Sequence, residues 1–307
     1  MPDNKPSQTE ANGEKTEKVN INKTERRTGF WKDAFRQIKQ SPAAIIGLVI
    51  ITIFLIMAVF GPYLTPYDPF EQNLMNSHEP PSLSHPLGTD FFGQDVLSRI
   101  IYGARISIMV GVVVVSLRAG IGVLAGLIAG YSGGWIERII MRLVDAFIAF
   151  PGILLALAIM AVRGQGVENV ILALTITGWP RFARLTRSEV ISVKEQEYVM
   201  AARALGQSGI KIIFNHILPN CISTIIIYAT MGIATPILAE AGLSFLGLGA
   251  TPDQATWGFQ MSLERQYLRT AWWGVTFPGI AVMLVVLGFN LFGDALRDIM
   301  DPRIKEY

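Results

Sequence analysis

Residues 197–220 read EYVMAARALGQSGIKIIFNHILPN, and they separate two long apolar runs without being apolar themselves. Apolar residues recur at helical spacing within EYVMAARAL and again within IKIIFNHI, a period typical of amphipathic helices. Gly206 stands between the two repeats, at the kind of position where glycine ends a helix. The pattern predicts two short amphipathic helices joined at Gly206, with Pro219 near the first turn of the next long helix, where proline is tolerated.

The composition indicates a membrane protein. Of the 307 residues, 51% are hydrophobic and 16% are charged, whereas soluble domains carry about 25% charged residues. Several apolar runs reach about 20 residues, the length that crosses a bilayer as a helix. The first run begins near Ala43 behind a long charged segment and has no cleavage site after it, so we expect it to remain as a membrane span.

The apolar runs predict an all-α membrane protein with six transmembrane helices. The fourth is the least apolar, because Pro180, Arg181 and Arg184 interrupt it. The predicted spans are residues 43–64, 103–130, 139–162, 168–186, 222–249 and 273–294.

The distribution of Lys and Arg orients these spans. With the N-terminus inside, the inside segments hold 20 of these residues and the outside segments hold four, as the positive-inside rule requires. Five or seven spans would put the basic stretch 181–220 and the basic tails on opposite sides. The sequence therefore predicts that both termini are cytoplasmic.

The chain divides into four parts by composition. Residues 1–29 are polar and poor in aromatics, which predicts a disordered cytoplasmic tail. Residues 30–42 place apolar side chains at i, i+4 and i+7, which favours an amphipathic helix on the membrane surface over an ordinary basic flank. Residues 43–102 hold the first span and an extracytoplasmic loop rich in turn residues, and residues 103–307 hold the other five spans.

The sequence contains no motif for catalysis or for a resident metal or cofactor. Gly-Lys never occurs as a pair, so there is no P-loop, and YSGGW at 131–135 is explained as a tight turn that needs glycine. His78 and His85 share a loop without other soft ligands, and His216 is distant in the chain, which argues against a metal site. No nucleophile is paired with a base, so we expect a protein that is not an enzyme.

A face of small residues runs along the second predicted span. Gly122, Gly126 and Gly130 follow one another at four-residue spacing, a pattern that lets another helix approach closely in lipid. The approaching helix is either another span of this chain or a helix of a partner subunit, and the sequence favours neither.

Arg118, Asp145 and Glu240 lie at membrane depth, where ionisable residues face a bundle interior or a watery path. For Asp145 we favour a local ion pair with Arg142, one turn away. Glu240 is placed equally well in a translocation path or in helix packing. An ion pair between Arg118 and Glu240 is not expected, because their depths differ by roughly 10 Å at 1.5 Å per residue.

The predicted topology puts the Gly206 hinge in the cytoplasm and leaves three interpretations of it. The hinge is a surface helix in the headgroups, a cap on the bundle, or a docking element for a cytoplasmic protein. The alanines of its first helix allow a very close approach, and Ala201, Ala202, Gly206, Leu218 and Pro219 resemble the E-A-A loop of ABC importer permeases. Met200 replaces the usual glutamate of that loop and His216 replaces an aliphatic residue.

Further motifs extend the resemblance from about Trp31 to the C-terminus. They are HPLGTDFFGQDVLSR at 85–99, GARISI at 103–108, EAGLSFLGLG at 240–249 and GDALRDIMDPR at 293–303. Gln94 stands where an arginine is more usual. Together the motifs are similar to the C-type permease of dipeptide, oligopeptide and nickel importers.

This resemblance implies a type I ABC importer permease (MetI-like) fold, with a permease domain at 103–307 and a coupling loop at 187–220. It implies that the loop docks on two cytoplasmic ATPase subunits, which would bind ATP and Mg²⁺, since this chain has no P-loop. The docking residues that it implies are Tyr198, Ala201, Ala202, Arg203, Leu205, Gly206, Leu218 and Pro219.

The resemblance also implies a second, similar permease subunit, an extracytoplasmic substrate-binding protein, and a place in the cell membrane of a prokaryote; it gives no role to nucleic acid. Dipeptides or oligopeptides are the expected substrates, with nickel, glutathione or another small solute as alternatives. A self-sufficient secondary transporter is the alternative from another class, but it favours inverted repeats, and none is found in the sequence.

Overall fold

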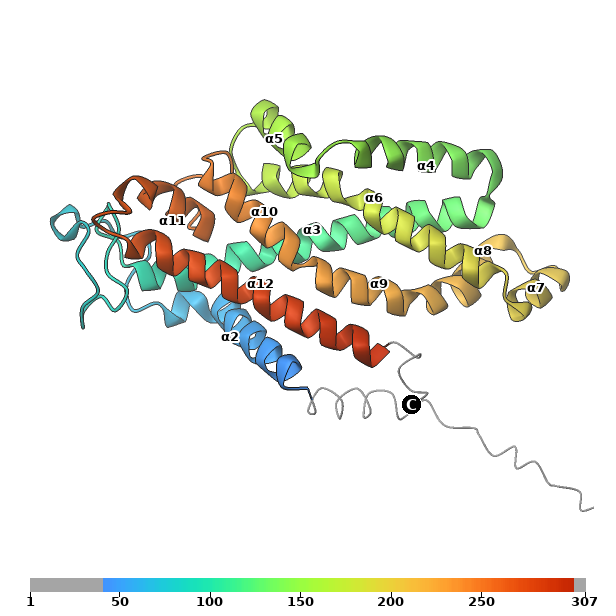
Figure 1. The fold of residues 1–307 in the computed structure, drawn as a ribbon, viewed down its shortest axis with the longest axis horizontal. Helices are drawn as coiled ribbons and strands as arrows, with labels where there is room; N and C mark the ends of the chain where they lie inside the picture. The colour runs from blue at the N-terminus through green and yellow to red at the C-terminus, as the bar shows by residue number, and fades with distance from the viewer. Residues whose placement is uncertain (1–40, 301–307) are drawn as a thin grey trace, which may run out of the picture.

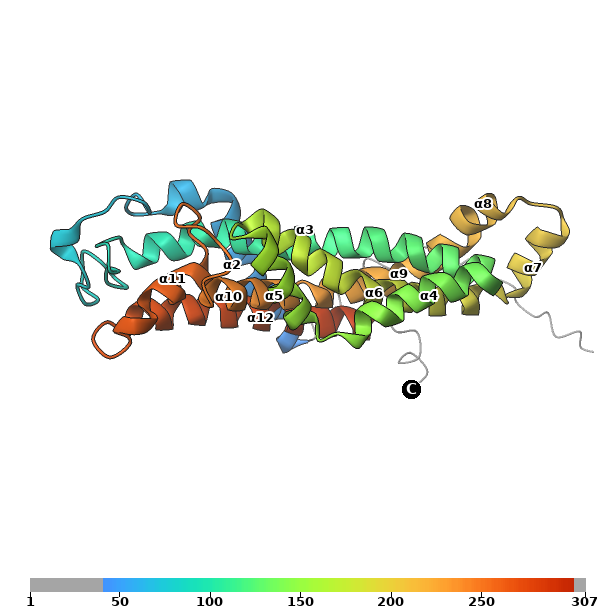
Figure 2. The ribbon, with the colours of Figure 1, turned by 90° about the horizontal axis from the view of Figure 1, so that it is seen from above.

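The computed structural model describes residues 41–300, and within this range the chain is helical, with one isolated β-bridge and no named strand. The predicted tail at 1–29 lies outside the described residues, as does the predicted surface helix at 30–42 apart from its last two residues. Long helices run side by side along the longest dimension of the molecule (Figures 1 and 2).

The helices fall into long elements and short connecting elements. The long elements are α2 (Pro42–Leu64), α3 (Val96–Ser132), α4 (Gly134–Ala149), α5 (Gly152–Arg163), α6 (Val167–Lys194), α9 (Leu218–Gly232), α10 (Ala234–Phe245) and α12 (Trp273–Met300). The short elements are η1 (Leu74–Asn76), α7 (Glu197–Ala204), α8 (Gly209–Ile212), the π-helical turn η2 (Ile213–Ile217), α11 (Trp257–Glu264) and η3 (Arg265–Tyr267).

Local sequence explains where the second long helix begins and ends. Asp95 caps α3, because its carboxylate accepts the backbone N–H of Ser98 at 2.8 Å, a bond that satisfies one of the free donors at a helix start. At the other end Gly133 and Gly134 have φ of +66° and +59°, a region that favours glycine. The stretch YSGGW is therefore a tight turn between α3 and α4, as predicted.

Within residues 41–300, four helical segments are long and apolar enough to cross a membrane, and a fifth candidate is a bent pair. The four are α2, α3, the continuous run Gly209–Phe245 and α12, and the pair is α4 with α5. The predicted fourth span, 168–186, lies within α6, which carries Arg181, Arg184 and Arg187 and is not among these candidates. Six spans and the side of each terminus therefore remain predictions.

The predicted third span, 139–162, is not one straight helix. It is divided between α4 and α5, whose axes differ by 86°. The break lies at Phe150 and Pro151, because a residue before proline is pushed out of the helical conformation.

The predicted fifth span, 222–249, begins earlier than expected. α8, η2, α9 and α10 form one run from Gly209 to Phe245. In the π-helical turn the N–H of Leu218 donates to the carbonyl of Ile213, five residues back, and the next residue is Pro219, which has no N–H to donate. The second short helix of the opening stretch is thus the first part of the long helix, and not a separate piece.

The small-residue face of α3 contacts α6 of the same chain. A Cβ atom on Gly126 would lie 2.6 Å from the carbonyl oxygen of Ala183, and one on Gly130 would lie 2.8 Å from the Cβ of Val190. A Cβ on Gly122 would overlap Phe182 in the same way. The glycines therefore set the close approach of two long helices within this chain, the first of the two arrangements that the sequence allowed.

Candidate functional site

The segment from Glu195 to Ile212, here called the α7–α8 hinge, lies at one end of the long axis (Figures 1 and 2). α7 ends in a Schellman arrangement, in which Gly206 N–H donates to the carbonyl of Arg203 at 3.0 Å and Gln207 N–H donates to that of Ala202 at 3.1 Å. Gly206 has φ of +78°, as this helix end requires. The end of the first short helix at Gly206 is as the sequence predicts, whereas the second belongs to the long run Gly209–Phe245.

One side of the α7–α8 hinge is packed on the helix bundle. Val199 and Ile212 are buried in a cluster that includes Leu127 of α3 and Val190 of α6. The phenol of Tyr131, at the end of α3, lies under the Arg203 guanidinium, 5.7 Å from it. The hinge is therefore fixed to the ends of two long helices.

The other side of the α7–α8 hinge presents apolar side chains to the outside. Leu205 is 88% exposed and Ile210 is 71% exposed, with Tyr198 and Met200 about half exposed beside them. A Cβ atom on Gly206 would meet nothing within 4 Å. A cluster of exposed apolar residues on one face is typical of a surface that binds another protein.

The remaining predicted docking residues are distributed over both sides. Ala201 is exposed and Ala202 is half-buried. Leu218 is half-buried at the base of the hinge, and Pro219 is exposed in the first turn of α9.

His216 ties the hinge to the long helix that follows it. Its Nε2 lies 2.9 Å from Oε1 of Gln207, directly after the hinge glycine, and its carbonyl accepts the amide of Asn220 at 2.6 Å. The sequence does not indicate that Tyr131 and Gln207 hold the hinge. Their contacts with Arg203 and His216 form only in the folded chain, and no pattern of neighbouring residues marks them.

The expected ion pair of Asp145 with Arg142 is wrong. Asp145 of α4 accepts a hydrogen bond from Arg184 of α6 at 2.7 Å, and one level further along, Arg187 pairs with Glu137. Packing of α4 beside α6 brings these groups together, and such tertiary contacts outweigh the proximity of Arg142 in the sequence.

Arg118 and Glu240 lie apart, as expected. Arg118 Nε donates to the carbonyl of Leu174 on α6 at 2.8 Å. Glu240 is fully buried in α10, where its carboxylate accepts the hydroxyl of Ser244 at 2.7 Å. Glu240 is therefore enclosed among packed helices in this chain, which agrees with a role in helix packing and not with an open translocation path.

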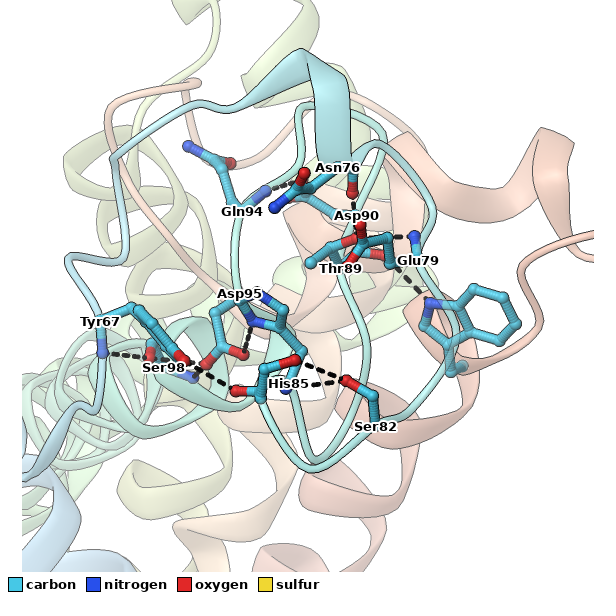
Figure 3. Close-up of polar contacts among 12 residues, drawn as sticks. Tyr67, Asn76, Glu79, Ser82, His85, Thr89, Asp90, Gln94, Asp95 and Ser98 are labelled. Carbon is cyan, nitrogen blue, oxygen red and sulfur yellow. Dashed lines mark hydrogen bonds and ion pairs between the residues drawn. The ribbon is translucent and has the colours of Figure 1, made fainter.

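The loop between α2 and α3 lies at the end of the molecule opposite the hinge (Figure 1), and a polar network orders it (Figure 3). Asp90 is buried and accepts the N–H of Gln94 at 2.8 Å, and the Arg99 guanidinium lies 3.6 Å away. Burial raises the pKa of the Asp90 carboxyl to about 6, against the opposing charge of Arg99. Beside it, Asp95 accepts from the Ser98 hydroxyl at 2.7 Å and lies 3.0 Å from His85.

Glu264 of α11 fixes this loop to the rest of the protein. Its carboxylate is 3.0 Å from His78 Nε2 and accepts the N–H of Phe91 at 2.8 Å, and Trp273 Nε1 donates to the carbonyl of Thr89 at 3.0 Å. Within residues 41–300 no group of three His, Cys, Asp or Glu residues is arranged to hold a metal ion. The network therefore holds the loop between α2 and α3 against α11 and the start of α12.

Two family models match the chain. Residues 122–306 match the binding-protein-dependent transport system inner membrane component, and residues 29–81 match the N-terminal transmembrane domain of oligopeptide transport permease C.

Relatives of known name extend over nearly the whole chain. The dipeptide transport system permease protein of Alkalihalophilus pseudofirmus is 49% identical, and 90% of each chain is covered. The oligopeptide transport system permease protein of Bacillus subtilis is 39% identical and the glutathione transport system permease protein of Escherichia coli is 42% identical, each over 90% of this chain and 91% of the relative.

A solved structure has the same fold. The MetNI methionine ABC transporter in an inward-facing conformation aligns with a TM-score of 0.54 over 67% of this chain and 98% of its own chain, at 18% identity. The fold is therefore MetI-like, as the resemblance implied. With its helical bundle, its apolar spans and these matches, the chain belongs to the family of binding-protein-dependent transport system inner membrane components, the permease subunits of ABC importers.

Proposed function

We propose that this protein is a peptide-importing permease subunit with six spans and both termini in the cytoplasm. The observation that carries the coupling mechanism is the two-sided α7–α8 hinge. Val199 and Ile212 bury one side against α3 and α6, while Leu205 and Ile210 leave the other side apolar and exposed. A partner that docks on the exposed side would move the ends of the long helices with it.

The partners proposed for this surface are two ATPase subunits, which would supply the energy from ATP and Mg²⁺. The docking residues are those of the resemblance: Tyr198, Ala201, Ala202, Arg203, Leu205, Gly206, Leu218 and Pro219. Exposed leucine and isoleucine side chains gain by burial in a partner's groove, at about 25 cal/mol per Å² of apolar surface. A second, similar permease and an extracytoplasmic binding protein would complete the importer in a prokaryotic cell membrane.

Small peptides are the substrate class that we propose. The relatives are named for dipeptides, oligopeptides and glutathione, which share a peptide backbone and at least one free carboxylate. Nickel and other small solutes remain outcomes of the uptake experiment.

The test replaces a single exposed leucine. Leu205→Asp puts a charge on the docking surface, and because the side chain is 88% exposed, the chain should still fold. We expect the variant to insert in the membrane but to lose ATPase subunits on co-purification and to lose ATP-dependent peptide uptake. Leu83→Asp is the matched control, since Leu83 is fully exposed in the loop at the opposite end.

Two results would contradict the proposal. If the Leu205→Asp protein keeps its ATPase subunits and transports normally, the hinge is not the docking surface. If the unaltered protein transports peptides when purified alone and without ATP, it is a self-sufficient transporter and not an importer subunit.

A further inference from the structure

Four arginine side chains form a ladder along one edge of α6. Arg181, Arg184 and Arg187 follow one another at three-residue spacing on this helix. Arg118 reaches over from α3 and lies against Gly178, where an added Cβ atom would overlap its guanidinium. At 1.5 Å per residue the steps along the helix are about 4.5 Å each, so the four guanidinium groups follow one another closely along α6.

Only one half of this ladder is neutralised by acidic residues. Arg184 pairs with Asp145 and Arg187 pairs with Glu137, both from α4. In the part of the chain that the structure describes, neither Arg118 nor Arg181 forms an ion pair with a carboxylate. Two adjacent guanidinium groups thus carry uncompensated charge.

The position of these two groups makes lipid an unfavourable neighbour. Arg181 lies near the middle of α6, roughly 20 Å from either end at 1.5 Å per residue. α6 is not among the apolar candidate spans, and an arginine in such a helix faces a bundle interior or a water-filled path and not hydrocarbon. Arg181 is exposed in this chain, so the surface around it must meet water or a partner subunit.

The surroundings of Arg181 supply further hydrogen-bond donors. An open groove of about 400 Å³ lies beside it, with Ser188 and Tyr228 in its lining. Tyr228 comes from α9 and is held by an edge-to-face contact with Phe182, whose ring centre is 4.9 Å away. The Arg118 guanidinium lies against Gly178, three residues before Arg181 on the same helix. Guanidinium and hydroxyl donors of this kind match the two oxygens of a carboxylate.

We propose that Arg118, Arg181 and Tyr228 form a binding site for an acidic side chain of the peptide in transit. The inference rests on the proposed peptide transport and adds to it a preference for peptides with acidic side chains. The two unpaired arginines attract anionic groups, while the paired Arg184 and Arg187 mark the end of the site toward α4. A cargo with an additional carboxylate is favoured by this charge, and a cargo with an additional ammonium group is disfavoured.

The test compares two tripeptides, Ala-Glu-Ala and Ala-Lys-Ala, in proteoliposomes that contain the complete importer. The binding protein is loaded to saturation with each peptide, so that its own preference does not enter the maximum uptake rate. We expect Arg181→Gln to lower the maximum rate for the glutamate peptide about tenfold, as for the loss of a charge-assisted hydrogen bond, and to leave the lysine peptide unchanged or faster. Arg181→Lys should restore much of the preference.

Arg142→Gln is the matched control, because Arg142 is an exposed arginine on α4. It should leave both rates unchanged. Arg118→Gln should act in the same direction as Arg181→Gln, but the exposed position of Arg181 makes its variant the safer one for folding.

The outcomes separate this inference from the function on which it rests. If the unaltered importer carries neither peptide, the proposed substrate class fails. If it carries both, and Arg181→Gln lowers the two rates equally or not at all, the arginines act in structure or in contact with lipid headgroups, and the carboxylate site is refuted.

Discussion

Replacement of Glu264 by alanine should release the loop between α2 and α3 from α11. Glu264 is 2% exposed and has two partners in that loop, the N–H of Phe91 at 2.8 Å and Nε2 of His78 at 3.0 Å. In the variant both partners lose their acceptor. The bond from Trp273 to the Thr89 carbonyl stays, so we expect the loop to open more often and not to unfold permanently.

The size of the effect follows from these two contacts. Loss of one partner of a hydrogen bond to a charged group costs on the order of 1.5–3 kcal/mol, and the partial exposure of Phe91 lowers the figure, because water replaces some of the bond. We expect the free energy of local opening to fall by about 2–3 kcal/mol in total. This corresponds to an equilibrium constant for opening that is roughly 30- to 150-fold larger.

Hydrogen exchange measured by mass spectrometry on the purified protein reports this opening directly. Peptides that cover residues 88–95 should exchange faster in Glu264→Ala, while peptides from α6 should not change. Glu79→Ala is the matched control, because it removes a carboxylate of the same loop whose side chain forms no hydrogen bond in the structure. Equal exchange in Glu264→Ala and the unaltered protein, or equal acceleration in the control, would refute the assigned role of Glu264.

Three further substitutions test other contacts. Gly126→Leu forces a side chain where a Cβ atom alone would lie 2.6 Å from α6, so thermal unfolding in detergent should show a loss of about 2 kcal/mol or more; an unchanged unfolding temperature would contradict the close packing. Asp90→Asn removes a carboxyl whose pKa is raised to about 6. Between about pH 4 and 6 the folded protein keeps this proton while the unfolded chain releases it, so the unaltered protein should lose up to about 3 kcal/mol of stability as the pH rises through this window. The variant should show no such loss in the same unfolding assay. Arg184→Gln breaks a half-exposed ion pair with Asp145 and should cost only about 0–1 kcal/mol in the same unfolding assay.

The α7–α8 hinge was predictable because its signals are local. Helical spacing and a glycine at the junction are properties of neighbouring residues, and the structure has the Schellman ending that Gly206 indicates. The bend at Pro151 was not expected, since a run of membrane-spanning length does not reveal whether it is straight. The start of the long helix at Gly209 was also missed, because Pro219 is as compatible with a helix start as with the π-helical turn before it.

Contacts between distant residues account for most of what was not predicted. His78 and Glu264 are 186 residues apart in the chain, and no pattern in a single sequence indicates their pairing. α11 lies in a segment that the sequence treats as a loop, and its buried Trp257, which donates to the carbonyl of Ile100, gives no periodic signal there. Asp145 has two arginines within reach in principle, and only the packing of α4 on α6 selects Arg184.

The π-helical turn at Ile213–Ile217 holds one residue more than an α-helical turn would. Each residue of an α-helix advances the chain by about 1.5 Å and about 100°. If this additional residue were carried in ordinary α-helix, everything before it would be rotated by about 100° relative to α9 and α10, and the exposed face around Leu205 would point in another direction. The wider π-helical turn closes around the additional residue instead, so the helix before it stays nearly in phase with α9, and the face around Leu205 keeps its orientation.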